Sequence, residues 1–460
     1  MHAPEVAARK GWDGQEGSDF ELASIFPDLH GPLGLKEALA EAGRCLECGS
    51  SERPAPCMVA CPAGVDVPGF VTAIARGDTA CAADIIFDKN ILGASCARVC
   101  PVEQFCEGAC VLHSERRRPV EIGRLQRFAT ETELRKRSRF RRTAKPNGKR
   151  VSVIGAGPAG LTCAAELAAR GYSVVLYDKN EDHGGLVRYA IAPYRIRRDP
   201  LPAEVEMIEE LGVEFRLGTG IDTPEQLAAI EAESDAIFLG IGLGADVQLH
   251  YPGEELPGVY SSLDFVRAIK TGAPPAVGER VAVIGGGNTA IDVARESLRL
   301  GSRDVTLYYR RTRSEMPAYP HEVDEALSEG IHIQFLTTLV AFHGSDRLRS
   351  IALAYMQLAE PDGSGRPKPV QVPRTEFEVP ADTAILAVGQ ERRSAFLAWI
   401  DGMRLEGGLI PVDPETGQTS NPKYFAGGDS LNGGATAVEA VKNGRTAASG
   451  IDRYLGGEGI

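Results

Sequence analysis

Two long stretches of the chain share one pattern of apolar and polar positions. Each begins with a short apolar run, passes through a glycine-rich turn into a helix with small apolar residues, and ends in a second apolar run. The stretches are KRVSVIGAGPAGLTCAAELAARGYSVVLYDK (149–179) and RVAVIGGGNTAIDVARESLRLGSRDVTLYYRR (280–311). Short apolar runs bounded by turn residues predict buried strands, and strand, turn, helix and strand together predict a βαβ unit. The chain therefore carries an internal duplication of nucleotide-binding architecture.

Two further strands indicate how the copies are connected. DAIFLGIG (235–242) and DTAILAVG (382–389) are similar apolar runs that end in glycine, and we expect the chain to leave and re-enter one domain at them. The second copy is then inserted into the first. This predicts a first domain formed by residues 146–270 and 382–460, with an inserted domain at 271–381. The last stretch, PKYFAGGDSLNGGATAVEAVKNGRTAA, reads as a strand, a Gly-Asp turn and a helix that complete the first domain.

Residues 1–145 form a third region, with short helical patterns punctuated by Pro and Gly. It closes with the basic run RKRSRFRRTAKPNGKR (135–150), which we interpret as a solvated connector; a docking surface for an acidic partner is the alternative. The predicted fold class is α/β: an α-helical, cysteine-rich domain precedes two dinucleotide-binding domains.

Composition excludes some functions. The 460 residues carry a net charge of −13, which argues against nucleic acid as a partner because duplex binding depends on neutralising phosphates. No apolar run approaches the roughly 18 to 20 residues of a membrane span, and the first 20 residues lack the apolar core of a signal peptide. We expect a cytoplasmic protein without a membrane partner.

The first glycine-rich turn has the G-x-G-x-x-G pattern at Gly155, Gly157 and Gly160. The first glycine permits the tight turn, the second lets a pyrophosphate approach the backbone, and the third lets helix and strand pack closely. The helix that follows directs its free N–H groups at the phosphates. Asp178, at the end of the second strand, is placed to accept hydrogen bonds from a ribose.

The second turn has Gly285 and Gly287, with Ala290 in the third position. Its second strand ends in Arg310 and Arg311 where the first copy has an acid. Arginines accommodate the 2′-phosphate of NADPH, whereas an acid favours the free 2′-OH of NADH. We therefore expect NADPH in preference to NADH; arginines merely solvated at a strand end are the alternative.

Nine of the ten cysteines lie between Cys45 and Cys110, and Cys163 is the exception. An odd local count in a reducing compartment fits poorly with disulfides. The two sets are Cys45, Cys48, Cys57 and Cys61, then Cys96, Cys100, Cys106 and Cys110. Each contains C-x₃-C-P, the end of the bacterial ferredoxin pattern. Two [4Fe–4S] clusters are favoured over zinc, which needs only four thiolates. Cys81 and Cys163 are expected to pack in the core.

Iron–sulfur centres accept single electrons, whereas a nicotinamide gives up a hydride, and a flavin can do both. We therefore place FAD in the first nucleotide site and NADPH in the second. Asp429 is expected to bind the ribityl chain, and the helix that starts near residues 436–438 to direct its dipole at the isoalloxazine. The residues predicted to bind FAD are Gly155, Gly157, Gly160, Asp178, Gly185, Asp429, Thr436, Ala437 and Val438. Those predicted to bind the nicotinamide nucleotide are Gly285, Gly287, Asn288, Thr289, Arg310 and Arg311.

The chain resembles the small (beta) subunit of glutamate synthase over nearly its whole length. It is also similar to the N-terminal electron-input half of dihydropyrimidine dehydrogenase and to the separate bacterial subunit equivalent to that half. The segments that carry the resemblance are RCLEC, CMVACPAGVDVPGF, NILGASCARVCPVEQFCEGAC, PVEIGRLQRFATE, VIGAGPAGL, VIGGGNTAIDVA and YFAGGD.

The resemblance implies FAD, NAD(P)H and two [4Fe–4S] clusters, and it assigns the metal ligands. One cluster would take Cys45, Cys48, Cys57 and Cys110. The other would take Cys61, Cys100, Cys106 and the side-chain oxygen of Gln126, while Cys96 would bind no metal. Glutamine at that position is typical of the dihydropyrimidine dehydrogenase branch, whereas RRTRSEMPAYPHEV (310–323) is more like glutamate synthase. The interval between Cys48 and Cys57 is longer than the family usually shows, so the first cluster would lie in a reshaped loop.

We expect hydride transfer from NADPH or NADH to FAD, and then transfer of single electrons through the clusters to a catalytic partner subunit. That subunit would be of the dihydropyrimidine dehydrogenase type or the glutamate synthase large-subunit type. No residue of this chain is a candidate for acid–base chemistry on pyrimidine or glutamate. Two alternatives remain open: a reductase that delivers electrons to ferredoxin by itself, and a redox sensor with vestigial nucleotide folds.

Overall fold

A computed structural model describes residues 22–50, 52–136, 143–361 and 365–457. The first 20 residues, on which the expectation about a signal peptide depends, lie outside these ranges. So do positions 137–142 of the basic run, which we interpret as a solvated connector. The chain divides into two compact units, which are described separately. The larger unit comprises Leu29–Arg188, Arg198–Leu243 and Arg392–Ile460, and the inserted unit comprises residues 22–28, Tyr189–Arg197 and Gly244–Glu391.

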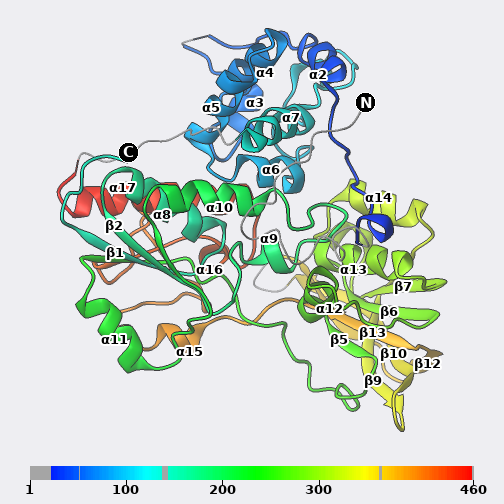
Figure 1. The fold of residues 1–460 in the computed structure, drawn as a ribbon. Helices are drawn as coiled ribbons and strands as arrows, with labels where there is room; N and C mark the ends of the chain where they lie inside the picture. The colour runs from blue at the N-terminus through cyan, green and yellow to red at the C-terminus, as the bar shows by residue number, and fades with distance from the viewer. Residues whose placement is uncertain (1–21, 51, 137–142, 362–364, 458–460) are drawn as a thin grey trace. The chain divides into compact units, whose positions relative to one another are not determined.

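Short helices form the N-terminal part of the larger unit, as expected for the cysteine-rich region (Figure 1). Asp66 and Asp78 accept hydrogen bonds from the first-turn N–H groups of two of them and so determine where these helices begin. Fully buried Phe70, Phe87 and Leu125 form the core between them. The elements are α2 (Leu35–Ala42), α3 (Pro56–Ala60), α4 (Val67–Ala75), α5 (Thr79–Lys89), α6 (Gly93–Val99), η1 (Val111–His113) and α7 (Ile122–Arg135).

The rest of the larger unit is built on a five-stranded sheet in the order β14-β4-β1-β2-β3, in which every pair is parallel. Its strands are β1 (Arg150–Ile154), β2 (Ser173–Tyr177), β3 (Glu214–Arg216), β4 (Ala236–Leu239) and β14 (Tyr424–Ala426). The helices are α8 (Pro158–Ala169), α9 (Leu186–Tyr189), α10 (Leu201–Glu210), α11 (Pro224–Ala232), α15 (Ser394–Leu397), α16 (Asp429–Asn432) and α17 (Ala437–Tyr454). α8 packs closely against α17, which brings the C-terminal helix to the first glycine-rich turn.

The inserted unit repeats this plan. Its parallel sheet has the order β5-β13-β6-β7-β8, and β9, β11 and β12 pair antiparallel with the long β10. The strands are β5 (Val259–Ser261), β6 (Arg280–Gly285), β7 (Asp304–Tyr309), β8 (His332–Phe335), β9 (Thr337–Gly344), β10 (Leu348–Pro361), β11 (Pro367–Gln371), β12 (Phe377–Pro380) and β13 (Thr383–Ala387). The helices are α12 (Ser262–Lys270), α13 (Asn288–Arg299), η2 (Arg313–Glu315) and α14 (Pro320–Ser328).

The predicted fold class is confirmed: cysteine-rich helices precede two parallel sheets, and the second sheet is inserted in the chain of the first. The extent of the inserted sheet differs from the expected 271–381. DTAILAVG forms β13, which pairs with β6 and β5 at the centre of the inserted sheet. Hydrogen bonding thus places the first strand of the inserted sheet, β5, before residue 271 and its last strand in the sequence, β13, after residue 381. The apolar patterns of β4 and β13 are alike, and only their pairing partners reveal that they belong to different sheets.

None of the helices in the described ranges combines the length and the apolar character that a membrane crossing requires.

Candidate functional site

The first glycine-rich turn joins β1 to α8 and depends on its glycines for different reasons. Gly155 has a φ of +107°, which side chains rarely adopt, and a Cβ there would lie 2.3 Å from the carbonyl oxygen of Gly240. A Cβ on Gly160 would lie 1.8 Å from the carbonyl oxygen of Gly155. A Cβ on Gly157, in contrast, would meet no atom within 4 Å. The second glycine therefore faces open space at the start of α8, where a phosphate can approach the backbone.

Asp178 follows β2 and lies beside this turn. Its Oδ2 accepts a hydrogen bond of 2.7 Å from the Ala156 amide, and its Oδ1 accepts bonds from Asn180. Gly185 lies on the other side, where its Cβ position would be 3.0 Å from the Cα of Gly157. The structure thus brings together all five residues that the sequence predicts around the first turn: Gly155, Gly157, Gly160, Asp178 and Gly185.

The C-terminal part of the predicted flavin site also lies in the larger unit. Asp429 accepts a hydrogen bond of 3.1 Å from the Ala435 amide, and burial raises the pKa of its carboxyl group. Thr436 caps α17, so that the helix begins at Ala437, within the range expected from the sequence. Val438 is buried in the first turn of that helix.

Sequence reasoning missed Arg393. Its Nε donates hydrogen bonds to the carbonyl oxygens of Ile241 and Leu243, beyond the carboxyl end of β4. Burial lowers the pKa of its guanidinium, and the negative charge of Asp178 raises it. Arg393 thus places a positive charge near Asp178, the residue predicted to bind the ribose. No motif marks it, because it lies more than 200 residues from Asp178 in the sequence.

The second glycine-rich turn joins β6 to α13 and leaves the same opening. A Cβ on Gly285 would lie 2.3 Å from the Ala387 carbonyl oxygen, whereas one on Gly287 would meet nothing within 4 Å. Ala290, in the third position, is fully buried. Asn288 begins α13, and its Oδ1 accepts a hydrogen bond of 2.9 Å from the Tyr319 amide. Thr289 follows it in the first turn.

The arginines after β7 differ from one another. Arg311 is buried, and its Nε donates to the Pro367 carbonyl oxygen at 3.0 Å. Arg313 pairs with Asp324 at 2.5 Å. Arg310 is exposed, and no side-chain hydrogen bond or ion pair joins it to the described part of the chain. Of the three, Arg310 is therefore the arginine with most of its donors available to a ligand.

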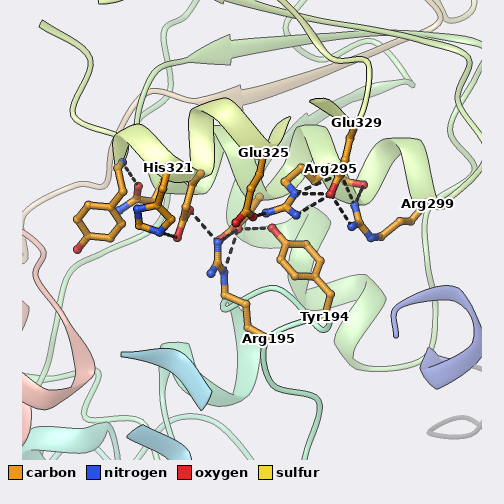
Figure 2. Close-up of polar contacts among 11 residues, drawn as sticks. Tyr194, Arg195, Arg295, Arg299, His321, Glu325 and Glu329 are labelled. Carbon is orange, nitrogen blue, oxygen red and sulfur yellow. Dashed lines mark hydrogen bonds and ion pairs between the residues drawn. The ribbon is translucent and has the colours of Figure 1, made fainter. Parts of the chain in front are cut away.

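A buried network of charges lies behind the second turn (Figure 2). Tyr194 donates a hydrogen bond to Asp292 of α13, and Arg195 pairs with Asp292 at 3.1 Å and with Glu322 at 2.7 Å. Burial lowers the pKa of the Arg195 guanidinium, but the carboxylates outweigh this effect and raise it overall. Tyr194 and Arg195 belong to residues Tyr189–Arg197, which the chain contributes to this unit before it continues into α10.

The same network continues along α13. Arg295 is almost fully buried and pairs with Glu325 at 3.0 Å and with Glu329 at 2.6 Å, and Arg299 also binds Glu329 (Figure 2). Burial alone would raise the pKa of Glu329, but hydrogen bonds from Arg299 and Arg295 lower it to about 2. Sequence reasoning missed this network, because charges three and four residues apart on a helix usually mark a solvated face.

The thiols of the first predicted cluster line one cavity. Every cysteine is a free thiol, and among the described residues no three His, Cys, Asp or Glu side chains converge closely enough for a single metal ion. The cavity is lined by Cys45, Leu46, Cys48, Pro56, Cys57, Val67, Pro68, Val71, Ala109, Cys110, Val111, Leu112, Val120 and Ile122. Burial raises the pKa of Cys57 to about 11, because the charged thiolate would be poorly solvated in this cavity. The four predicted ligands, Cys110 included, are thus assembled from distant segments.

The second predicted set also comes together. Burial raises the pKa of Cys106, and the neighbouring Glu107 and Cys61 raise it further. A hydrogen bond with Cys96 and burial raise the pKa of Cys100, to which Cys106 and Cys61 also contribute. Cys61 therefore lies near enough to Cys100 and Cys106 for its charge to affect both thiols.

Three further residues of this region were assigned from the sequence. Gln126 on α7 donates a hydrogen bond of 2.7 Å from its Nε2 to the Gly93 carbonyl oxygen, at the start of the helix that leads to Cys100. Cys163 is buried, as expected. The prediction that Cys81 packs in the core is wrong: Cys81 is exposed, because α5 turns Ala82, Ile86 and Phe87 inward.

Comparisons with known proteins match two consecutive segments of the chain to family models. Residues 23–138 match the model of dihydropyrimidine dehydrogenase domain II, 4Fe-4S cluster, and residues 149–444 match that of pyridine nucleotide-disulphide oxidoreductase. The chain is 36% identical to the glutamate synthase [NADPH] small chain of Halomonas elongata, over 94% of each chain. It is 38% identical to the NADP(+)-dependent formate dehydrogenase subunit beta of Moorella thermoacetica, over 87% of this chain but only 60% of that protein.

Solved structures support the fold alone. FprA from Mycobacterium tuberculosis (His57Gln mutant) superposes with a TM-score of 0.57 at 20% identity, covering 68% of this chain and 85% of that one. Lactococcus lactis thioredoxin reductase superposes with a TM-score of 0.52 at 22% identity, covering 67% of this chain and 99% of that one.

Proposed function

Because the chain belongs to the pyridine nucleotide-disulphide oxidoreductase family and carries a 4Fe-4S domain before that fold, we propose that it is the electron-input subunit of a larger oxidoreductase. It is an NAD(P)H-dependent, FAD-containing oxidoreductase. In this proposal it takes electrons from NADPH and passes them through FAD and two [4Fe–4S] clusters to a partner subunit. The observation that carries the proposal is that the cysteine-rich helices and the first nucleotide fold form one compact unit.

The larger unit fits a flavin nucleotide. The space at Gly157 admits a pyrophosphate against the N-terminus of α8, and Asp178 is placed for the ribose. Asp429 would bind the ribityl chain, and the start of α17 at Thr436, Ala437 and Val438 would direct its positive end at the isoalloxazine. When bound, a flavin accepts a hydride and releases single electrons.

The two groups of thiols fit the clusters. Cys45, Cys48, Cys57 and Cys110 would hold one, because they line a single cavity. Cys61, Cys100 and Cys106 would hold the other, together with the Oε1 of Gln126. The Nε2 of Gln126 is bound to Gly93, which restrains the side chain and leaves the oxygen as its remaining polar atom. Positive iron would relieve the unfavourable burial of these thiolates.

The inserted unit fits NADPH better than NADH. The opening at Gly287 and the first turn of α13, with Asn288 and Thr289, suits the pyrophosphate. Arg310 would bind the 2′-phosphate through charge-assisted hydrogen bonds. The sequence assigned Arg311 the same role, but its bond to Pro367 indicates that it instead holds the strand end against β11.

The partner we propose is a separate catalytic subunit. A glutamate synthase-type large subunit is the first to test, because the Halomonas elongata small chain matches this chain over 94% of each length. A dihydropyrimidine dehydrogenase-type subunit is the second, because Gln126 and the match at residues 23–138 favour that branch.

The test is anaerobic purification followed by counts of iron, sulfide and flavin and by mixing with NADPH. We expect about eight irons for two [4Fe–4S] clusters, one flavin, bleaching of the flavin by NADPH and then reduction of the clusters. Cys110→Ser should lose about half of the iron, whereas Cys81→Ser, at an exposed thiol outside both sets, should lose none. Protein without iron, or flavin that stays oxidised under excess NADPH, would refute the proposal.

A further inference from the structure

One buried carboxylate joins the cysteine-rich helices to the flavin-binding fold. Glu204 lies on α10, and its side chain is fully buried against the start of α6. We propose that Glu204 is a positioning residue for electron transfer, because it fixes the ligands of the second cluster relative to the flavin site. The inference rests on the proposed function, and all the residues involved lie in the larger unit.

The contacts of Glu204 account for both of its oxygens. Oε1 accepts hydrogen bonds from the amides of Ala94 at 2.7 Å and Ser95 at 3.0 Å, and Oε2 accepts one from the Ser95 hydroxyl. The first amides of a helix have no partner within the helix. The carboxylate therefore caps α6 from a position about 110 residues away in the sequence, and its charge also suits the positive end of that helix.

α6 connects two predicted ligands of the second cluster, because Gln126 is bound at its start and Cys100 follows its end. The carbonyl oxygen of Gly93 accepts the hydrogen bond from Gln126, and α6 leads directly to Cys100, whose amide bonds to the Cys96 carbonyl. Arg98 then ties α6 to α7 through Glu131, at 2.6 Å. A displacement of α6 would therefore move Cys100 and Gln126 together.

The other end of the connection reaches the flavin site. One turn before Glu204, Leu201 lies so close to Gly184 that a Cβ there would be 2.2 Å from the Leu201 Cδ2. The amide of Gly184 donates to the Ala156 carbonyl oxygen at 2.8 Å, within the first glycine-rich turn, and α10 also packs against α8. A continuous series of contacts therefore runs from that turn through Leu201 and Glu204 to Ala94 and Ser95.

Connecting two helices through a buried carboxylate has an energetic cost, because the charged group must be desolvated. Burial raises the pKa of Glu204 to about 7, although the Ser95 and Ala94 donors and the charge of Arg98 lower it. An apolar residue would hold two helices together by packing alone, without desolvation of a charged group. What packing cannot do is bind three donors and so fix the direction and position of α6.

The experiment compares Glu204→Ala and Glu204→Gln in the full chain with Glu209→Gln, at an exposed position on the same helix. Stopped-flow absorbance separates two rates, bleaching of the flavin by NADPH and reduction of the clusters, while EPR of the reduced protein reports on cluster geometry. For Glu204→Ala we expect unchanged flavin bleaching, cluster reduction slowed by about tenfold or more, since small displacements have large effects on rates, and an altered EPR signal. Glu204→Gln should restore most of the rate, because its Oε1 still accepts from both amides; Glu209→Gln should match the wild type.

Two results would overturn the inference. One is wild-type cluster reduction with an unchanged EPR signal in Glu204→Ala. The other is an equal fall of both rates in both Glu204 variants, which would mean a general loss of folding. Both are judged against a wild-type protein that contains iron and whose flavin NADPH bleaches, so a failure of the proposed function is recognised separately.

Discussion

The two glycine-rich turns of this chain differ in their third position and in what covers the helix that follows. At Gly160 a Cβ would lie 1.8 Å from the Gly155 carbonyl oxygen, whereas Ala290 carries its methyl group fully buried at the equivalent position. α8 therefore lies closer to its turn than α13 does. The same motif demands glycine in one copy and accepts alanine in the other, because the local packing decides what the third position can hold.

The elements that cover α8 and α13 contact these two helices in chemically different ways. α8 is covered by α17 through close apolar contact: a Cβ on Gly444 would lie 2.3 Å from the Ala159 carbonyl oxygen. α13 is covered by Tyr194, Arg195 and α14 through buried ion pairs (Figure 2). α8 thus meets α17 by close packing with an ion pair, Arg445 to Glu166 at 3.4 Å, whereas α13 meets its neighbours through several buried ion pairs. Substitutions at equivalent positions should therefore have unequal effects.

The largest difference is expected at the third position of the turn. Gly160→Ala forces a backbone displacement, and we expect destabilisation beyond the ~1–3 kcal/mol typical of overpacking, with loss of bound flavin. Ala290→Gly should cost only about 1 kcal/mol, the helix propensity of glycine relative to alanine, and leave the flavin in place. The ratio of flavin to protein and thermal unfolding measure both. Full flavin content in Gly160→Ala would show that α8 can move away from its turn.

The next largest effect is expected in the charged network. Arg295→Ala removes a cation whose side chain is 1% exposed and leaves Glu325 and Glu329 without it. We expect a loss of about 3 kcal/mol, at the lower end for a buried pair, because both carboxylates are partly exposed. Denaturant unfolding of the inserted unit, followed through NADPH binding, measures it. The control is Arg303→Ala in the exposed pair with Glu279, where we expect no measurable change; equal effects would argue against a structural role of the network.

The sequence was sufficient for the features that local pattern encodes. Both turns, the strand before each, the placement of Asp178 and the beginning of α17 follow from apolar runs, glycine spacing and capping residues. It was insufficient where the outcome depends on distant partners. β13 has the pattern of β4 but pairs with β6, and Arg311 is bound by Pro367, which comes from another strand.

Dependence on distant partners also explains why the charged network and the role of Glu204 were not predicted from the sequence. Arg295 and Glu204 have the spacing of solvated helix residues, and only segments remote in the sequence turn them into buried, paired groups. The exposure of Cys81 depends in the same way on which face of α5 the tertiary packing covers.

A smaller effect is expected at the second position of each turn, where the two copies are alike. Gly157→Ala and Gly287→Ala place a methyl group in open space, so folding should be unaffected. The methyl group would occupy the space of a pyrophosphate, and each variant should weaken its own cofactor by about tenfold to a hundredfold, or ~1.4–2.8 kcal/mol. Flavin dissociation measures the first and the KM for NADPH the second. If Gly287→Ala bound NADPH normally, the nucleotide would not lie against that turn.

The smallest effect is expected after β2 and β7, where the two copies carry side chains of opposite charge. Asp178 follows β2, whereas Arg310 follows β7 and is exposed. Arg310→Gln removes a charge-assisted bond to the 2′-phosphate. Because Arg310 is exposed, solvent screens this bond, so it should be worth about 1 kcal/mol, and the KM for NADPH should rise about fivefold. The KM for NADH, which lacks that phosphate, should stay the same. Lys368→Gln, an exposed cation on β11 of the same unit, is the control and should change neither value. A parallel rise for both nucleotides in Arg310→Gln would mean that Arg310 acts on the common part of the cofactor, and the preference for NADPH would then need another source.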